Sequence, residues 1–214
     1  HEVTNVGHDR TQLANMAKLA KAVIETDELE VVADRGYCKG EEILACEEAG
    51  ITAYLPKPQT SGNLAKGRFG KPDFIYKADD DEYECPAGER LKWRFKTVEK
   101  GQTLHKYWSS ACPGCAIRSQ CTTGKNRRIA RWEHETVVDA LQVRLDREPE
   151  RMRARRETVA HPFGTIKSWM GSTHFQMKTL QRVSTEMSLH VLAYNMKRLI
   201  MIFGVKPRIE AIQA

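Results

Sequence analysis

The alternation of apolar segments over the first 58 residues constrains the fold more than any other feature of this sequence. Residues 8–26 repeat apolar side chains at helical spacing, and residues 29–37 (LEVVADRGY) carry a short apolar run typical of a buried strand. A second helix is expected over residues 40–50, closed by Gly50, and a second strand over residues 51–58, stopped by two prolines. Helix alternating with strand predicts an α/β fold in which neighbouring strands run parallel.

Residues 59–131 interrupt this alternation. They are rich in Gly, Lys and Cys and contain short alternating runs such as LKWRFKTV, which predicts a small β-rich insertion. Helical spacing then returns in residues 134–148 and again after Pro149, although Pro162 should kink or break that second helix. A last helix over residues 181–203 is apolar on most faces, so we expect it to pack in the core.

Composition limits the class of protein and its partners. With 41% hydrophobic and 29% charged residues, the chain is expected to be globular and soluble. A formal net charge of +6 is a mild excess that favours an anionic partner, nucleic acid first. The sequence has no apolar run long enough for a membrane span and no signal-peptide pattern, so we expect a cytoplasmic location. The sequence begins with His1 and not with an initiator Met, so we expect the chain to begin inside a longer protein.

Asp34 follows the apolar run of the first expected strand and precedes Arg35, Gly36 and Tyr37. Ligand sites in α/β sheets gather at the carboxyl ends of strands, where a carboxylate can hold a hard cation such as Mg²⁺. The alternative is an aspartate that only starts a turn.

Four of the six cysteines have the spacing of metal ligands: two residues separate Cys112 from Cys115, five residues separate Cys115 from Cys121, and Cys85 lies upstream. Four thiolates complete a tetrahedral shell, which predicts a structural Zn²⁺ site without an open position for substrate. An iron–sulfur cluster takes the same ligands, and reduced cysteines packed in a small core are a further alternative. In the absence of an export signal, disulfides are the less fitting interpretation.

A basic segment surrounds the stretch RRETVAHPFGTIKSWMG, with arginines at 151, 153, 155 and 156 and a lysine at 167. Arginines can grip phosphates through paired hydrogen bonds. The alternative is a solvated helix face.

Several motifs in order give the chain a family resemblance: HEVTNVGHDRTQL, ADRGY, EEILACEEAGITAYLPKP, YECPAGERL, CPGCAIRSQC, RWEHE, HPFGTIKSWMG and TEMSLHVLAYNMKRL. The sequence resembles the C-terminal part of a DDE transposase of bacterial insertion sequences. This resemblance implies an RNase H-like α/β core that lacks its first strands. Residues 1–58 would form the first part of that core, residues 59–131 a Cys-rich insertion domain, and residues 132–214 the helical C-terminal part.

The resemblance also implies a chemistry. In this family three carboxylates bind two divalent ions, Mg²⁺ or Mn²⁺, which drive the attack of water or a 3′-hydroxyl on a DNA phosphodiester. Asp34 matches the second carboxylate, and the first would lie on a strand before His1. The partners would be the transposon ends and the target DNA, and the protein would act as a homo-oligomer.

The third carboxylate of the family belongs to a helix motif of the form Y-x2-R-x3-E-x6-K. Here Arg153 stands at the Tyr position, Arg156 and Lys167 match the Arg and the Lys that lie near DNA, and Ala160 stands at the position of the acid. Glu157 could substitute for that acid only with a longer reach or a local distortion of the helix, because residues three apart on a helix are about 5–6 Å apart at Cβ.

The sequence therefore suggests a transposase catalytic domain whose activity is impaired at position 160. Two alternatives stay open at this point. One is a non-catalytic DNA-binding remnant of a transposase, and the other is a zinc-stabilised interaction module.

Overall fold

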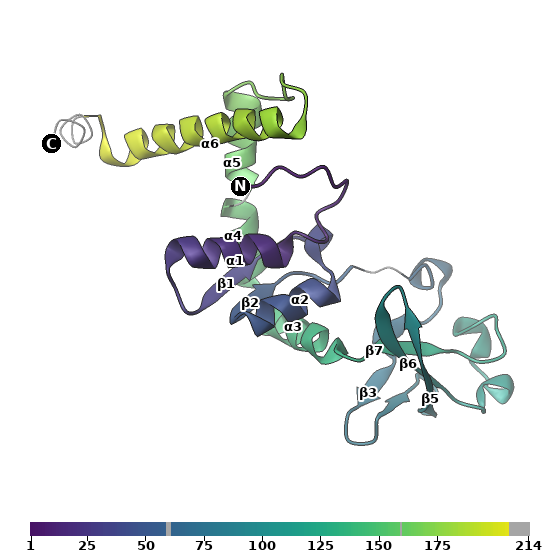
Figure 1. The fold of residues 1–214 in the computed structure, drawn as a ribbon. Helices are drawn as coiled ribbons and strands as arrows, with labels where there is room; N and C mark the ends of the chain where they lie inside the picture. The colour runs from purple at the N-terminus through teal and green to yellow at the C-terminus, as the bar shows by residue number, and fades with distance from the viewer. Residues whose placement is uncertain (59–60, 159, 206–214) are drawn as a thin grey trace. The chain divides into compact units, whose positions relative to one another are not determined.

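The computed structural model describes residues 1–58, 61–158 and 160–205, except for the side chain of residue 160, and it divides into two compact units (Figure 1). The first unit comprises His1–Pro56 and the segment that begins at Leu141, and the second comprises Lys57–Ala140. The second boundary falls inside a helix. The domain boundaries expected at residues 58 and 131 stay a prediction.

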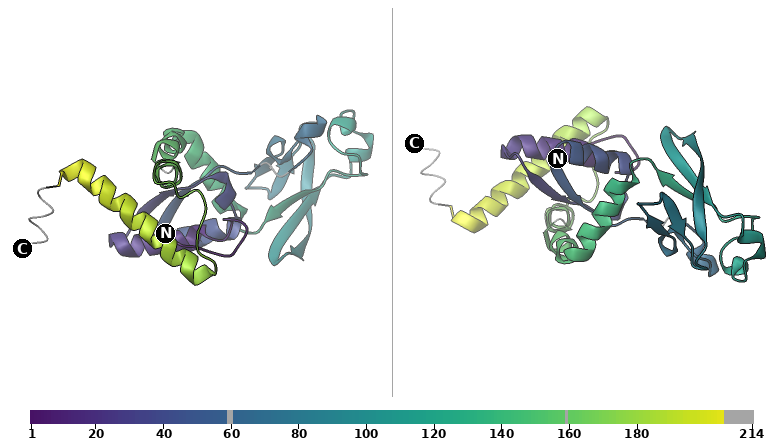
Figure 2. Two further views of the ribbon diagram at one scale, coloured as in Figure 1. Left: turned by 90° about the horizontal axis from the view of Figure 1, so that it is seen from above. Right: turned by 90° about the horizontal axis from the view of Figure 1, so that it is seen from below.

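The first unit begins with the expected helix–strand alternation. Its first four elements are α1 (Leu13–Ile24), β1 (Leu29–Val32), α2 (Gly40–Glu48) and β2 (Ile51–Tyr54). The two strands pair in parallel, with Leu29 opposite Ile51 and Val32 opposite Tyr54. Figure 2 shows α1 and α2 on one side of this strand pair and α4 on the other. The core between these layers contains Leu13, Ala17, Ile43, Cys46, Ile51, Ala53 and Leu55.

Four helical elements follow in the C-terminal half. They are α3 (Glu135–Arg147), α4 (Glu150–Thr158), α5 (Ala160–Gly164) and α6 (Leu180–Phe203), with the π-helical turn η6 (Thr165–Trp169) after α5. The expected disturbance at Pro162 is present, since the α-helix ends at Gly164, two residues after the proline, and changes to the π-helical turn η6.

The prediction that the last helix packs in the core is wrong for the described residues. Helix α6 has no buried residue, and many of its apolar side chains are exposed, from Leu180 at 50% to Phe203 at 61%, whereas Val183, Met187 and Val191 are half-buried. Figure 1 shows α6 crossing the segment of α5 and η6, both of which it contacts, and its C-terminal part extending beyond them. An apolar sequence indicates that a helix can be buried, but burial also requires a neighbouring element that covers it.

The second unit is an antiparallel sheet of five strands in the order β3-β4-β5-β6-β7. The strands are β3 (Ile75–Lys77), β4 (Glu82–Glu84), β5 (Arg90–Glu99), β6 (Gln102–Trp108) and β7 (Ile129–Trp132). Each strand pairs with its neighbour in sequence; short turns join β3 to β6, and a longer segment that contains Cys112, Cys115 and Cys121 joins β6 to β7. A bulge interrupts the β5–β6 register between Trp93 and Phe95.

One side of this sheet carries the core of the second unit. Phe74, Tyr83, Leu91, Tyr107 and Ile129 form a buried cluster. The hydroxyls of Tyr76 and Tyr107 both donate to one oxygen of Asp81 at 2.7 Å. These bonds satisfy the polar ends of the rings, which would otherwise cost free energy on burial.

The protein is thus a mixed α/β structure that combines a parallel strand pair, an antiparallel sheet and helices. Among the described residues, none of the helices combines the length and the apolar character that a membrane span requires.

Candidate active site and metal centre

Asp34 lies just beyond the carboxyl end of β1, where it caps the short 3₁₀ turn Arg35–Tyr37. Its Oδ1 accepts a hydrogen bond from the Gly36 amide at 2.7 Å. A Cβ at position 36 would lie 2.9 Å from the same oxygen, so glycine leaves the carboxylate in place. The turn interpretation and the strand-end interpretation therefore describe the same residue, and about half of the Asp34 side chain (49%) stays exposed.

Helix α4 brings cations to this end of β1. A guanidinium nitrogen of Arg155 lies 4.0 Å from Asp34 Oδ2. One turn earlier, Arg151 pairs with Glu30 of β1 at 2.8 Å and with Glu148 at 2.8 Å. The hydrogen bond from Arg151 lowers the pKa of the Glu148 carboxyl, helped by a second bond from the Tyr54 hydroxyl. These ion pairs hold α4 beside the strand that precedes Asp34.

Glu157 lies on another side of α4. Its carboxylate is 3.4 Å from Arg153 Nε, and both side chains are largely exposed. Because successive helical residues are 100° apart, Glu157 is rotated by about 200° from Arg155, the residue that faces Asp34. In this conformation the helix does not direct Glu157 toward Asp34, and its role as a substitute acid stays a prediction.

Position 160 is the first described residue of α5, two positions after Thr158, the last described residue of α4. The backbone of Ala160 is described, but the direction of its side chain lies outside the described residues. Arg156 and Lys167, which match the DNA-contacting positions of the family motif, are both exposed. Within the described part of the chain, neither of them forms an ion pair, so both cations are available to a ligand.

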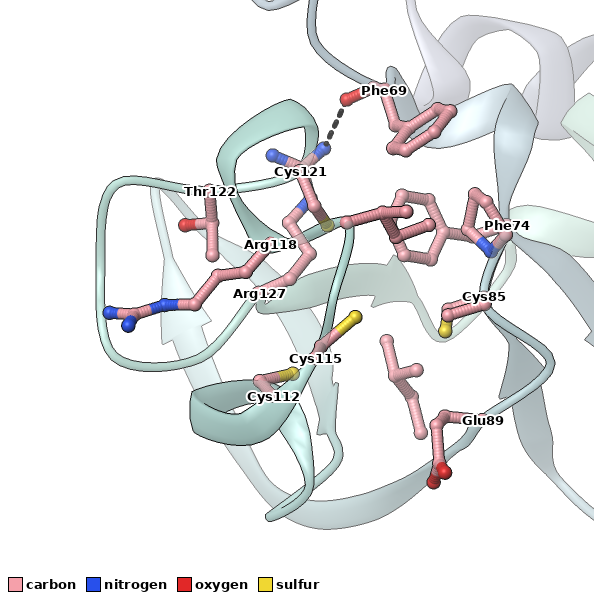
Figure 3. A pocket seen from close by; sticks show the side chains of 14 residues that line it. Phe69, Phe74, Cys85, Glu89, Cys112, Cys115, Arg118, Cys121, Thr122 and Arg127 are labelled. Carbon is pink, nitrogen blue, oxygen red and sulfur yellow. Dashed lines mark hydrogen bonds between the residues drawn. The ribbon is translucent and has the colours of Figure 1, made fainter.

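The four cysteines of the second unit line one cavity. Figure 3 shows Cys112 and Cys115 on one loop, Cys121 on the next turn and Cys85 on the opposite wall. Burial raises the pKa of the Cys121 thiol; Arg127 opposes this rise, and the three other cysteines add to it. Residues separated by up to 36 positions in the chain are therefore close enough to influence one another's ionisation.

No group of three or more His, Cys, Asp or Glu side chains is arranged to hold a metal ion among the described residues, and this covers both Asp34 and the cysteines. The cavity nevertheless fits a soft metal in its donor chemistry, since four thiols face it and nearly all of its exposed lining is apolar. The four cysteine side chains would have to move closer to one another to ligate an ion.

These features define a mixed α/β protein with a strand-end carboxylate, an arginine-rich helix beside it and a separate cysteine-lined unit. Residues 84–200 match the family model described as a transposase DDE domain, and the chain belongs to this family of DDE transposases. The match includes the four cysteines and the motif from Arg153 to Lys167, whereas Asp34 precedes it. Searches among curated proteins and among solved structures found no significant match.

Sequence reasoning missed two contributors to the site. It did not assign Gly36, whose lack of a side chain leaves the Asp34 carboxylate in place, or Arg155, which faces that carboxylate. The spacing Asp-x-Gly could have indicated the turn. No local signal could have singled out Arg155 among five neighbouring cations.

Proposed function

We propose that this chain is the C-terminal catalytic part of a DDE transposase, with an RNase H-like core, acting on DNA at insertion-sequence ends. The observation that carries the proposal is the position of Asp34 at the end of a parallel strand, with the arginine-rich helix α4 held beside it. This helix leads directly to position 160, where the family motif has its acid. An acidic strand end and a basic helix are the two parts needed to bind a divalent ion next to a DNA phosphate.

The residues of the chain would share this work. DDE transposase domains typically use a divalent metal, which activates the attacking oxygen and stabilises the leaving oxygen when bound. Asp34 would supply a ligand oxygen, because Gly36 orients one carboxylate oxygen and the other is only 4.0 Å from a cation that a metal ion could displace. Arg153, Arg156 and Lys167 would contact DNA phosphates from the exposed side of the helical segment.

The alanine at position 160 limits this chemistry. A methyl group cannot ligate a cation, so any ion at Asp34 would be held by fewer protein oxygens than the family motif provides. Each 1.4 kcal/mol of lost transition-state stabilisation costs about tenfold in rate, and a missing ligand should therefore cost several orders of magnitude.

The test is the variant Ala160→Glu, with Ala160→Gln as a control of the same size and without charge. We expect Ala160→Glu to bind Mn²⁺ at least about tenfold more tightly than the unchanged chain in a calorimetric titration, a gain of about 1.4 kcal/mol. Asp34→Asn in the same background should remove the gain. Equal Mn²⁺ affinity in the Glu and Gln variants, with both proteins folded, would refute a metal site formed by Asp34 and position 160 together.

A second candidate is a non-catalytic remnant that binds DNA without cutting it. The alanine at the acid position favours it, together with the exposed cations Arg156 and Lys167, which form no ion pair with any described residue. Cleavage of insertion-end DNA by the Ala160→Glu variant but not by the unchanged chain would identify the unchanged chain as such a remnant. In either case, binding should weaken steeply as salt rises, because phosphate contacts release counterions.

The proposal includes structural Zn²⁺ at Cys85, Cys112, Cys115 and Cys121, supported by their common cavity. Metal analysis of the protein purified under reducing conditions should find one zinc per chain. Cys115→Ser should lose it, and Cys38→Ser, outside the cavity, should retain it. Iron together with inorganic sulfide would instead indicate a cluster.

We also propose a homo-oligomeric assembly on DNA, which sedimentation with and without insertion-end DNA would test.

A further inference from the structure

The sheet of the second unit has a second side that does not carry the core. Strand alternation places Leu91 and Trp93 on the core side, together with Tyr107, the residue opposite Trp93. The bulge after Trp93 changes this alternation, because Phe95 lies opposite Lys106 and not on the side of Tyr107. Phe95 therefore joins Trp108, which shares its side of the sheet with Lys106.

Two arginines complete a cluster around Trp108. The guanidinium carbons of Arg94 and Arg128 lie 5.5 Å and 5.2 Å from the centre of its ring. Phe95 meets the same ring edge-on at 5.8 Å and is itself 44% exposed. We call this surface the ring–arginine face; it consists of Arg94, Phe95, Lys106, Trp108 and Arg128.

The charge of the ring–arginine face is positive and largely uncompensated. Lys106 pairs with Glu99 at 2.7 Å, and Arg94 donates from Nε to the Trp108 carbonyl at 3.2 Å. Within the described part of the chain, neither Arg94 nor Arg128 has a carboxylate partner. Stacking on Trp108 restricts both guanidinium groups, and their remaining N–H donors can bind an anion. A groove lies on the same face, over β5, β6 and the start of β7. It is lined by Phe95, Thr97, Glu99, Lys106, Arg128 and Ala130.

We propose that the ring–arginine face binds single-stranded DNA, with phosphates at Arg94 and Arg128 and a base stacked on Phe95. An exposed ring beside paired cations suits an unpaired strand, because each free base offers a flat surface for stacking. In duplex DNA the bases are already stacked on one another, and Phe95 would have no base to accept.

This inference deepens the DNA-binding part of the proposed function and assigns it to a different unit from Asp34. It predicts that the protein holds an unpaired segment of DNA independently of divalent metal. Failure of the metal site and failure of this face can therefore be told apart.

The experiment measures fluorescence anisotropy of labelled oligothymidylate of about 16 nucleotides, the upper end of common site sizes, with the whole chain and no added divalent ion. We expect Phe95→Leu, which keeps an apolar side chain but removes the ring, to weaken binding by about tenfold or more. Arg94→Ala combined with Arg128→Ala should reduce the slope of log affinity against log salt by about 1.4. The control Lys96→Ala removes one charge from the same strand on the opposite side and should change the affinity by less than the Phe95 variant.

The remaining outcomes decide the proposal. Equal losses in Phe95→Leu and Lys96→Ala would overturn it, as would equal binding of duplex and single strand, or tighter binding of RNA of the same sequence. Arg128→Gln, a change at an exposed side chain, serves as the second variant if Phe95→Leu unfolds, and unchanged salt dependence there would also overturn the proposal. Asp34→Asn should leave this single-strand binding unchanged, even though in the Ala160→Glu background it removes the gain in Mn²⁺ affinity.

Discussion

Two charged groups of this protein, one in each unit, are placed in opposite ways. In the second unit, Arg131 is 7% exposed, lies 3.8 Å from the Tyr76 ring centre and pairs with Asp139 at 2.8 Å. In the first unit, Asp34 is half exposed and its nearest cation is 4.0 Å away. Buried, fully paired charges help to specify one packed arrangement, whereas exposed, loosely paired charges remain available for ligands.

The apolar groups differ in the same way. Tyr107 and its neighbours are enclosed by strands that follow one another in sequence, whereas the apolar side chains of α6 are exposed. Local hairpins can complete a core by themselves, so the second unit is the more self-sufficient of the two. The following predictions test this contrast, beginning with the largest effect.

Tyr107→Ala should have the largest effect. The side chain is fully buried and its hydroxyl donates to Asp81, so its removal leaves a cavity and costs about 3–5 kcal/mol of unfolding free energy. The control Leu192→Ala, on the exposed helix α6 (55% exposed), should stay within about 0.5 kcal/mol. Denaturant unfolding followed by tryptophan fluorescence measures both. A loss at Leu192 as large as at Tyr107 would show that α6 is covered in solution.

Alkaline pH should unfold the second unit. Burial raises the pKa of Tyr83 to about 12, with Arg131 acting in the opposite direction. A tyrosine whose folded pKa is raised contributes stability that is complete below its unfolded pKa near 10 and is lost as pH rises through 12. The contribution is on the order of 3 kcal/mol. Tyrosinate absorbance and circular dichroism should change together between these values, and Tyr83→Phe should make the stability less dependent on pH there.

Gly36→Ala should separate stability from ligand binding in the first unit. The new Cβ would lie 2.9 Å from Asp34 Oδ1, and the carboxylate can turn away because it is half exposed. We expect a change in unfolding free energy of about 0.5 kcal/mol or less, with a clear loss of Mn²⁺ affinity in the Ala160→Glu background. Gly62→Ala, where a Cβ meets no atom within 4 Å, is the matched control. Unchanged Mn²⁺ binding in Gly36→Ala would remove Asp34 from the metal site.

Mild acid should produce the smallest effect, at the loop before α6. Glu186 accepts hydrogen bonds from the amides of Gln176 at 2.8 Å and Met177 at 2.9 Å, and these bonds lower the pKa of its carboxyl. A lowered folded pKa means that the contact is complete above the ordinary glutamate pKa and is lost as pH falls through the lowered value. NMR shifts of the two amides should report this local release. Glu186→Gln should remove the pH response, and a response that persists in that variant would contradict the assignment.

Much of the local structure followed from the sequence. Apolar spacing predicted the helix–strand alternation around Asp34, and the parallel pairing of β1 with β2 confirms it. The proline at 162 indicated a disturbed helix, and the chain changes there from α-helix to the π-helical turn η6. The DDE transposase family was also recognisable from the order of the motifs, and the match over residues 84–200 confirms it.

Other features depended on contacts between distant residues. The apolar pattern of α6 could not reveal that no described element covers it, because periodicity describes a helix and not its neighbours. Strand alternation alone would have placed Phe95 on the core side, since it lies two residues after Trp93. The bulge places Phe95 beside Trp108, and a single inserted residue leaves no reliable local signature.

The sequence by itself determined most helices and strands, because the spacing of apolar residues depends on neighbours only a few positions apart. It also supplied the chemical groups of the candidate sites. Only the tertiary structure decided that Arg155 lies beside Asp34, that four cysteines line one cavity and that two arginines flank Trp108. Such pairings arise from strand register and helix docking, in which one residue of shift turns a side chain to the opposite face.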